Sequence, residues 1–184
     1  AAGGSAPEFR ECIFTNNFAN PNDPNTHFDG GAVVNAYPGT LTYGGGIAFE
    51  ATAKLKLTDC QINENRADIG GGIYGSWSDP TITDCNIYDN TAHHGGGIVF
   101  SGGTNRVISS SIYDNQAVIG GAQGGGICSV GANTMIIDSQ IANNSSAGSG
   151  GGIYLSNKDV SEGPFANCEN IYIHNSLINS NSSN

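Results

Sequence analysis

Apolar residues in this chain recur at fixed positions in a repeating block of about 25 residues. In one block an apolar Ile82 is followed by Cys85, then by Ile87, and a glycine run leads to Ile98. Residues two apart share one face of a β-strand, so Cys85 and Ile87 point the same way. The step of three from Ile82 to Cys85 breaks this alternation, which predicts a bend between two short strands. Ile98 then marks a third strand.

The block occurs six times. Its reference position, occupied by Ile87 in the block above, is apolar in every copy: Phe14, Ile62, Ile87, Ile112, Ile141 and Ile178. Three residues later every copy has an asparagine: Asn17, Asn65, Asn90, Asn115, Asn144 and Asn181. The reference positions lie 48, 25, 25, 29 and 37 residues apart, which indicates a basic period of 25 with insertions.

Three short strands per repeat, each in register with the next copy, predict an all-β fold. We expect a right-handed parallel β-helix, a solenoid of about six coils stacked ~4.8 Å apart. The 3.6-residue apolar stripe of a helix is missing from every copy, which disfavours helical solenoids. A propeller blade would need about 40 residues or more.

The recurring polar columns have structural explanations. Asparagine tolerates left-handed backbone, and asparagines stacked in register can hydrogen-bond to each other along the axis. We therefore expect the six asparagines to form a ladder. The glycine run before each third strand permits backbone conformations closed to other residues, at a corner where coils approach closely.

Residues 1–184 are predicted to form a single β-helix domain with loop insertions. The insertions are expected at residues 20–41 and 154–170. The first could hold a degenerate extra coil or a hairpin. The last copy stops directly after its asparagine turn, so we expect this domain to be part of a longer chain or of an assembly.

The charge balance narrows the range of partners. Six Lys and Arg residues face 16 Asp and Glu residues, giving a formal net charge of −10. Nucleic acids and anionic membrane surfaces favour basic patches, so we expect no nucleic-acid partner. No apolar run approaches the ~20 residues of a membrane helix, so no membrane insertion by this segment is expected.

The pairing of "GGAV" or "GGGI" with "FTNN", "INEN", "IYDN" and "IANN" resembles a known repeat. It is similar to the GGA[ILV] and FxxN repeats of chlamydial polymorphic outer membrane proteins. The resemblance implies a right-handed parallel β-helix on an extracellular adhesin or surface fibre. This chain departs from the pattern in preferring GGGI to GGAI, and Ile to Phe before xxN.

The main functional alternative is a carbohydrate-active β-helix, either a polysaccharide lyase or hydrolase or a glycan-binding module. Such enzymes need clustered carboxylates, or carboxylates that hold calcium beside a basic residue. Glu64, Asp89 and Asp114 form one column just before the asparagines and are the candidate calcium ligands. No Lys or Arg clearly faces this column, and His93 and His94 lack metal-spaced partners. We therefore assign no catalytic residue and no cofactor, and expect the protein not to be an enzyme.

Cysteines and glycosylation sequons bear on the compartment. Cys128 follows the third-strand isoleucine and should point outward, while Cys168 lies in the second insertion, so a Cys128–Cys168 disulfide is predicted for an oxidising compartment. Five cysteines leave at least one thiol unpaired within the chain. Sequons occur at Asn143, Asn144 and Asn181; Asn143 lies outside the ladder column and is the better acceptor.

The sequence therefore favours a secreted, structural or adhesive protein of the cell surface. A solenoid end without a cap presents unpaired strand edges, and a head-to-tail contact between subunits need not close. We expect self-association into fibrils, or contact with neighbouring subunits, with glycans as further partners.

Overall fold

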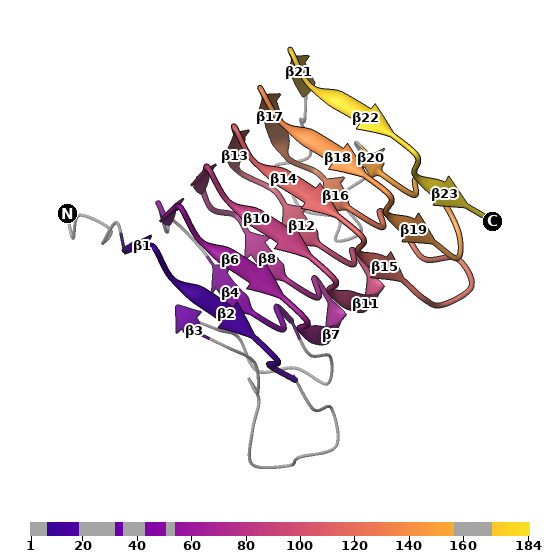
Figure 1. Cartoon of the computed structure of the whole chain (residues 1–184), viewed down its shortest axis with the longest axis horizontal. Helices are drawn as coiled ribbons and strands as arrows, with labels where there is room; N and C mark the ends of the chain where they lie inside the picture. The colour runs from indigo at the N-terminus through magenta and orange to yellow at the C-terminus, as the bar shows by residue number, and fades with distance from the viewer. Residues whose placement is uncertain (1–6, 19–31, 35–42, 51–53, 157–170) are drawn as a thin grey trace.

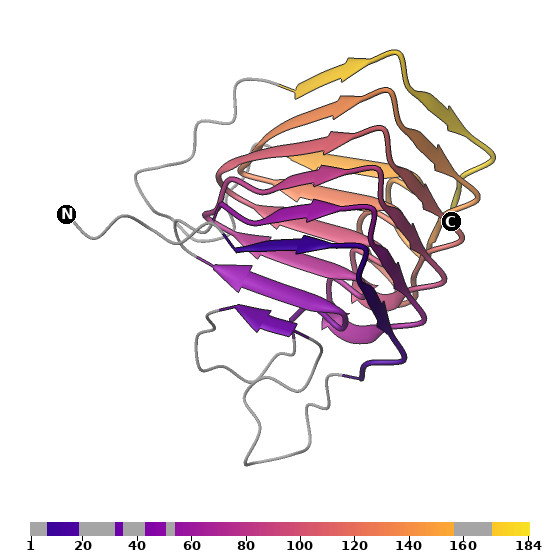
Figure 2. The same cartoon turned by 60° about the vertical axis from the view of Figure 1, so that its left-hand side comes forward.

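The computed structural model describes residues 7–18, 32–34, 43–50, 54–156 and 171–184. All regular structure in these ranges is β, and every strand pairing is parallel (Figures 1 and 2). The strands form four sheets that run along one axis, as predicted for a parallel β-helix. No helix that could cross a membrane is found in the described ranges.

Each sheet collects one strand from successive coils. Sheet A holds β1 (Glu8–Arg10), β5 (Lys56–Thr58), β9 (Thr81–Thr83), β13 (Thr104–Ile108), β17 (Asn133–Ile137) and β21 (Ile171–His174). Sheet B holds β2 (Ile13–Thr15), β6 (Gln61–Asn63), β10 (Asn86–Tyr88), β14 (Ser111–Tyr113), β18 (Gln140–Ala142) and β22 (Leu177–Asn179). Sheet C holds β7 (Arg66–Ile69), β11 (Thr91–His94), β15 (Gln116–Ala117), β19 (Ser145–Ser146) and β23 (Ser182–Ser183). Sheet D holds β3 (Ala32–Val34), β4 (Ile47–Glu50), β8 (Ile73–Ser76), β12 (Ile98–Ser101), β16 (Ile127–Val130) and β20 (Ile153–Ser156).

A coil therefore has four strands, and the prediction of three was wrong. Four coils are complete in the described ranges (β5–β8, β9–β12, β13–β16 and β17–β20), and partial coils flank them. The missed strand belongs to sheet C, directly after each ladder asparagine. Its inward residues are small, such as Ala92 paired with Ala67 and Ala117, so it gives no apolar signal.

Two left-handed turns on non-glycine residues flank sheet B in each coil. In the second complete coil they fall on Asp84, between sheets A and B, and on Asp89, between sheets B and C, with φ of 53° and 54°. The left-handed residue is thus the one before the ladder asparagine, and not the asparagine itself as predicted. Asp and Asn adopt this backbone region more readily than most other residues.

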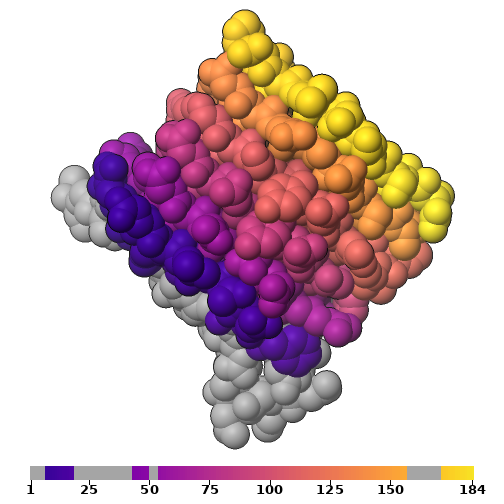
Figure 3. Space-filling model, in the orientation of Figure 1, coloured from indigo at the N-terminus to yellow at the C-terminus, as the bar shows by residue number. Residues whose placement is uncertain are grey.

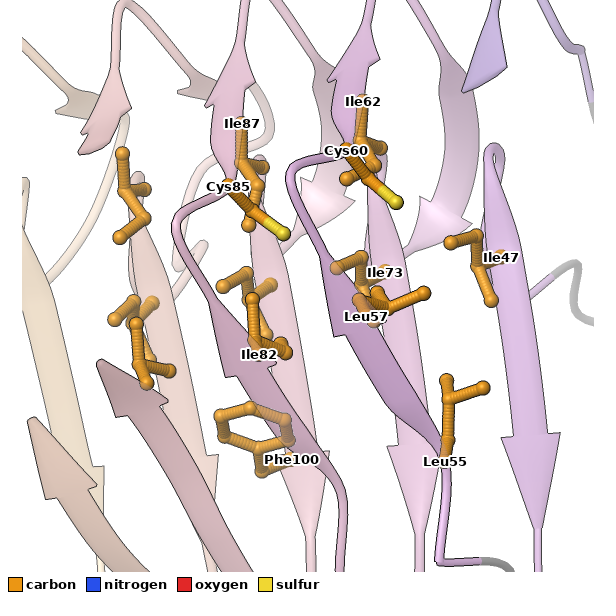
Figure 4. Packing of buried hydrophobic residues seen from close by; sticks show 14 of the residues in the cluster. Ile47, Leu55, Leu57, Cys60, Ile62, Ile73, Ile82, Cys85, Ile87 and Phe100 are labelled. Atoms are coloured by element: carbon orange, nitrogen blue, oxygen red, sulfur yellow. The ribbon is translucent and has the colours of Figure 1, made fainter. Parts of the chain in front are cut away.

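The interior is a continuous column of apolar side chains. Isoleucines of sheets B and D meet the apolar residues of sheet A, and Cys60 and Cys85 fill the narrow bend between sheets A and B (Figure 4). The reference positions are in register, so Ile87 pairs with Ile62 on one side and Ile112 on the other. Full burial of one such side chain stabilises the fold by ~1.5–3 kcal/mol.

The glycine run is needed where the chain turns into sheet D. A Cβ atom on Gly97 would lie 2.5 Å from the carbonyl oxygen of Gly126 in the next coil, closer than such contacts allow. Gly95, two residues earlier, has φ of 62°. Close approach of coils and left-handed backbone therefore both require glycine at this corner.

The structure describes a short part of each predicted insertion. Residues 32–34 of the first form β3, which pairs parallel with β4 and so belongs to a further coil rather than to an antiparallel hairpin. Residues 154–156 of the second belong to β20. The remaining residues of the second insertion, 157–170, lie outside the described residues.

Candidate functional site

The six ladder asparagines lie in one stack at the corner between sheets B and C. The Nδ2 of each of the first five donates to the Oδ1 of the asparagine in the next coil, at 2.8–3.0 Å. The backbone N–H of the same residue donates to the same Oδ1 at 2.9–3.1 Å. From Asn65 onward, each Nδ2 also donates to the carbonyl of the reference residue one coil back. The side-chain amides are thus occupied by hydrogen bonds within the protein, so the role of the ladder is structural.

The column of Glu64, Asp89 and Asp114 runs beside the ladder on left-handed turns, with φ of 54–57°. Burial, followed by repulsion from Asp114 and Glu64, raises the pKa of the Asp89 carboxyl. Within the described ranges, no three or more His, Cys, Asp or Glu side chains are grouped to hold a metal ion. The predicted calcium ligands are therefore not assembled into a site. Each of the three carboxylates lies on a left-handed turn of a different coil, and its position is set by that turn.

Two tyrosines stack next to this acidic column on the outer face of sheet B. The rings of Tyr88 and Tyr113 are 4.9 Å apart and only 2° from parallel. Burial, and then the neighbouring Tyr88 and carboxylates, raise the pKa of Tyr113. The repeat register brings these two rings together, because Tyr88 and Tyr113 are partners across β10 and β14.

The described cysteines are free thiols. Cys60 and Cys85 point inward, and the Sγ of Cys85 donates to the Thr83 carbonyl at 3.2 Å. Burial raises the pKa of Cys85 to about 12. Cys128 is on the outer face of sheet D as predicted, yet it is only 3% exposed, and burial raises its pKa to about 12. Cys128 thus forms no disulfide with any described residue; its predicted partner, Cys168, lies outside the described ranges.

The three sequons differ in accessibility. Asn143 is exposed on a left-handed turn, with φ of 55°. Asn144 is fully buried in the ladder, and Asn181 is partly buried at its end. Glycosylation at Asn143 remains a prediction that this geometry permits.

An apolar groove of about 320 Å³ follows the corner between sheets C and D. It is lined by Tyr43, Ile69, Tyr74, His94, Val99, Ser101, Gln123, Cys128 and Val130. The Tyr43 and Tyr74 rings lie 4.6 Å apart. Burial, and then the neighbouring His93, lower the pKa of His94. The described lining thus carries no Asp, Glu, Lys or Arg. The sequence pattern that indicates this groove is an apolar residue at the outward position directly after each GGGI isoleucine. That position holds Tyr74, Val99 and Cys128 in successive coils.

His93 and His94, which lack metal-spaced partners in the sequence, differ in their surroundings. The Nδ1 of His93 lies 3.0 Å from a carboxylate oxygen of Asp68 in the coil before. His94 instead lines the apolar groove. Neither belongs to a group of possible metal ligands among the described residues.

The comparison with known families concerns one coil. Residues 138–156 match the Chlamydia polymorphic membrane protein repeat. The matched segment includes β18, β19 and β20, with the ladder residue Asn144 and the glycine run before Ile153. The resemblance noted in the sequence is therefore confirmed for this coil. No curated protein sequence and no solved structure matches the chain.

Proposed function

We propose that the protein is an extracellular structural or adhesive module of a cell surface, and that its β-helix stacks end to end with a second copy. The polymorphic membrane protein repeat in residues 138–156 supports the surface location. The ladder and the left-handed turns account for the recurring polar residues, which leaves the outer faces and the two ends for partners.

The observation that supports the stacking proposal is the pairing of the end strands in sheets A and B. At one end of the described solenoid these strands are β1 and β2, and at the other end they are β21 and β22 (Figures 1 and 3). Each of the four pairs in parallel with a described strand on one side, so a second copy would pair its β1 with β21 and its β2 with β22.

The side chains at the two ends are also compatible. Ile173 and Ile178 continue the interior columns of Ile136 and Ile141, and their exposed fractions are 42% and 44%. In the same columns at the other end, Phe9 and Phe14 are partly buried and pack edge to face at 5.7 Å. Stacking would place Ile173 over Phe9 and Ile178 over Phe14, which continues the core across the junction.

The asparagine ladder has complementary ends as well. Asn17 donates to Asn65, and no described residue donates to the Oδ1 of Asn17. At the other end, Asn181 accepts from Asn144, and its own backbone N–H has no described acceptor. A second copy would join the Asn181 donors to the Asn17 acceptor. This contact is heterologous, so repeated stacking produces filaments.

Sedimentation velocity over a concentration series, with electron microscopy of the concentrated sample, tests the proposal. We expect the wild-type chain to form linear assemblies. Ile178→Lys and Asn17→Ala, which alter opposite ends, should each weaken assembly. The matched control is Ile119→Lys, because Ile119 is 37% exposed but lies in a loop away from both ends. A wild-type chain that stays monomeric at millimolar concentration would refute stacking.

A further inference from the structure

Three of the six Lys and Arg residues of this acidic chain lie together on one face. Lys56 and Arg106 are outward residues of sheet A, on β5 and β13, and both pair with Thr81 of β9 between them. The two cations are therefore two levels apart, or about 10 Å along the axis. Lys54, two residues before Lys56, lies on the same side. Together with Asp79 and Thr104, these residues line a groove of about 360 Å³, which we name the sheet A groove: Lys54, Lys56, Asp79, Thr81, Thr104 and Arg106.

The groove cations have no ion-pair partner among the described residues. Elsewhere, Arg10 pairs with Glu8, and Arg66 lies over the Phe18 ring with its guanidinium carbon 5.8 Å from the centroid. Lys158 lies outside the described residues. Three of the six Lys and Arg residues of a chain with net charge −10 thus meet in one groove, without an ion pair to any described carboxylate.

The local charge of the groove is the reverse of the charge of the whole protein. Three cations and the single carboxylate of Asp79 give its described lining a formal charge of +2. Cations in excess over carboxylates repel each other, and an anionic ligand would relieve this repulsion. The strands hold the groove rigidly: Thr81 N–H donates to the Leu55 carbonyl and Arg106 N–H to the Pro80 carbonyl. A site built on strands in this way is preorganised for binding.

The remaining polar groups indicate the kind of anion. Thr81 and Thr104 offer hydroxyl groups that both donate and accept hydrogen bonds. One oxygen of Asp79 accepts from the Thr104 N–H at 2.9 Å, and the carboxylate has further acceptor capacity. A carboxylate inside the groove repels a phosphate backbone but accepts hydrogen bonds from sugar hydroxyls. Acidic sugars combine such hydroxyls with an anionic group, and they match this mixture better than nucleic acid does.

We propose that the sheet A groove binds an acidic oligosaccharide. Lys54, Lys56 and Arg106 would hold its carboxylate or sulfate groups, and Asp79 with the two threonines would bind its hydroxyls. This inference rests on the proposed surface function and gives it a ligand class. Binding of a soluble oligosaccharide does not require stacking, so the two proposals fail independently.

Calorimetry and amide chemical-shift titration of the dilute chain test the inference. The probes are an oligogalacturonate for carboxylates, a heparin-derived tetrasaccharide for sulfates, and maltotetraose as a neutral sugar. We expect at least one acidic probe to bind, to shift amides of β5, β9 and β13, and to weaken with added salt. Trp77, the single tryptophan, lies two residues before Asp79 and offers a second, fluorescence readout.

Two matched variants separate a site from general charge attraction. Arg106→Gln and Arg66→Gln each remove one cation, but only Arg106 lines the groove. We expect Arg106→Gln to raise the Kd at least ten-fold and Arg66→Gln less than two-fold. Equal effects of the two variants, or no binding of either acidic probe, would overturn the inference. Tighter binding of a single-stranded DNA oligomer through the same amides would assign the groove to nucleic acid instead.

Discussion

The asparagine ladder yields a quantitative prediction for Asn90→Ala. Asn90 is fully buried. Its Nδ2 donates to the Asn115 Oδ1 and to the Ile62 carbonyl, both at 2.9 Å, and its Oδ1 accepts from the backbone N–H and the Nδ2 of Asn65, both at 3.0 Å. At a net contribution of ~1 kcal/mol for each of these bonds, the substitution should cost about 4 kcal/mol of unfolding free energy.

The matched control is Asn17→Ala, at the end of the same ladder. The Asn17 side chain donates one hydrogen bond to a described residue, the Oδ1 of Asn65, which keeps a second donor in the Asn17 backbone N–H. The expected loss is therefore about 1 kcal/mol. Equilibrium urea unfolding at a concentration where the chain is monomeric measures both values, with equal m-values as a check on cooperativity. If the losses of the two variants differ by less than about 1 kcal/mol, the energetic role of the ladder is refuted.

Three further predictions concern the coil corners. Gly97→Ala should destabilise the fold by about 1–3 kcal/mol in urea unfolding, because its Cβ would meet a carbonyl oxygen at 2.5 Å. The Cys85 thiol should resist alkylation in the folded protein at about pH 8, as followed by peptide mass spectrometry, because burial raises its pKa to about 12. Asp89→Asn should stabilise the protein at about pH 7. Folding raises the pKa of Asp89, so the folded protein favours the protonated carboxyl. The stability that this protonation provides at low pH is lost as the pH rises through that pKa, and Asn carries no charge to be penalised there.

Each of these predictions has its own control. Gly120→Ala should be near neutral, since no atom lies within 4 Å of the place that its Cβ would take and its φ is not left-handed; a loss equal to that of Gly97→Ala would contradict the steric argument. The partly exposed Cys12 should be alkylated faster than Cys85. The gain from Asp89→Asn should shrink between about pH 7 and about pH 3, and a constant gain would point to turn propensity instead of charge.

Much of the fold could be predicted from the repeat, because buried columns impose residue types. The reference isoleucines and the ladder asparagines fill the same place in every coil, and the period of 25 sets their register. Sheet C was missed for a physical reason. Its inward residues, such as Ala92 and Ser146, are small because the corner is narrow, and small residues do not mark a strand.

The sheet A groove was partly within reach of the sequence. Lys56 and Arg106 differ by 50 residues, two basic periods, which places them in one outward column. The depth of the groove could not be predicted, since it depends on the turn that carries Asp79 and on side chains from three coils.

The backbone preference of the turns accounts for much of the negative charge of the chain. Seven of the 16 Asp and Glu residues occupy left-handed turn positions: Glu11, Asp59, Glu64, Asp84, Asp89, Asp114 and Asp138. These carboxylates lie in two rows, at the corners on either side of sheet B. Their number reflects what the backbone accepts there, so the net charge is weak evidence for a cation ligand. The informative charges are the cations of the sheet A groove, because no turn requires them. In a protein that repels anions over most of its surface, this groove would admit an acidic sugar only where its cations face it.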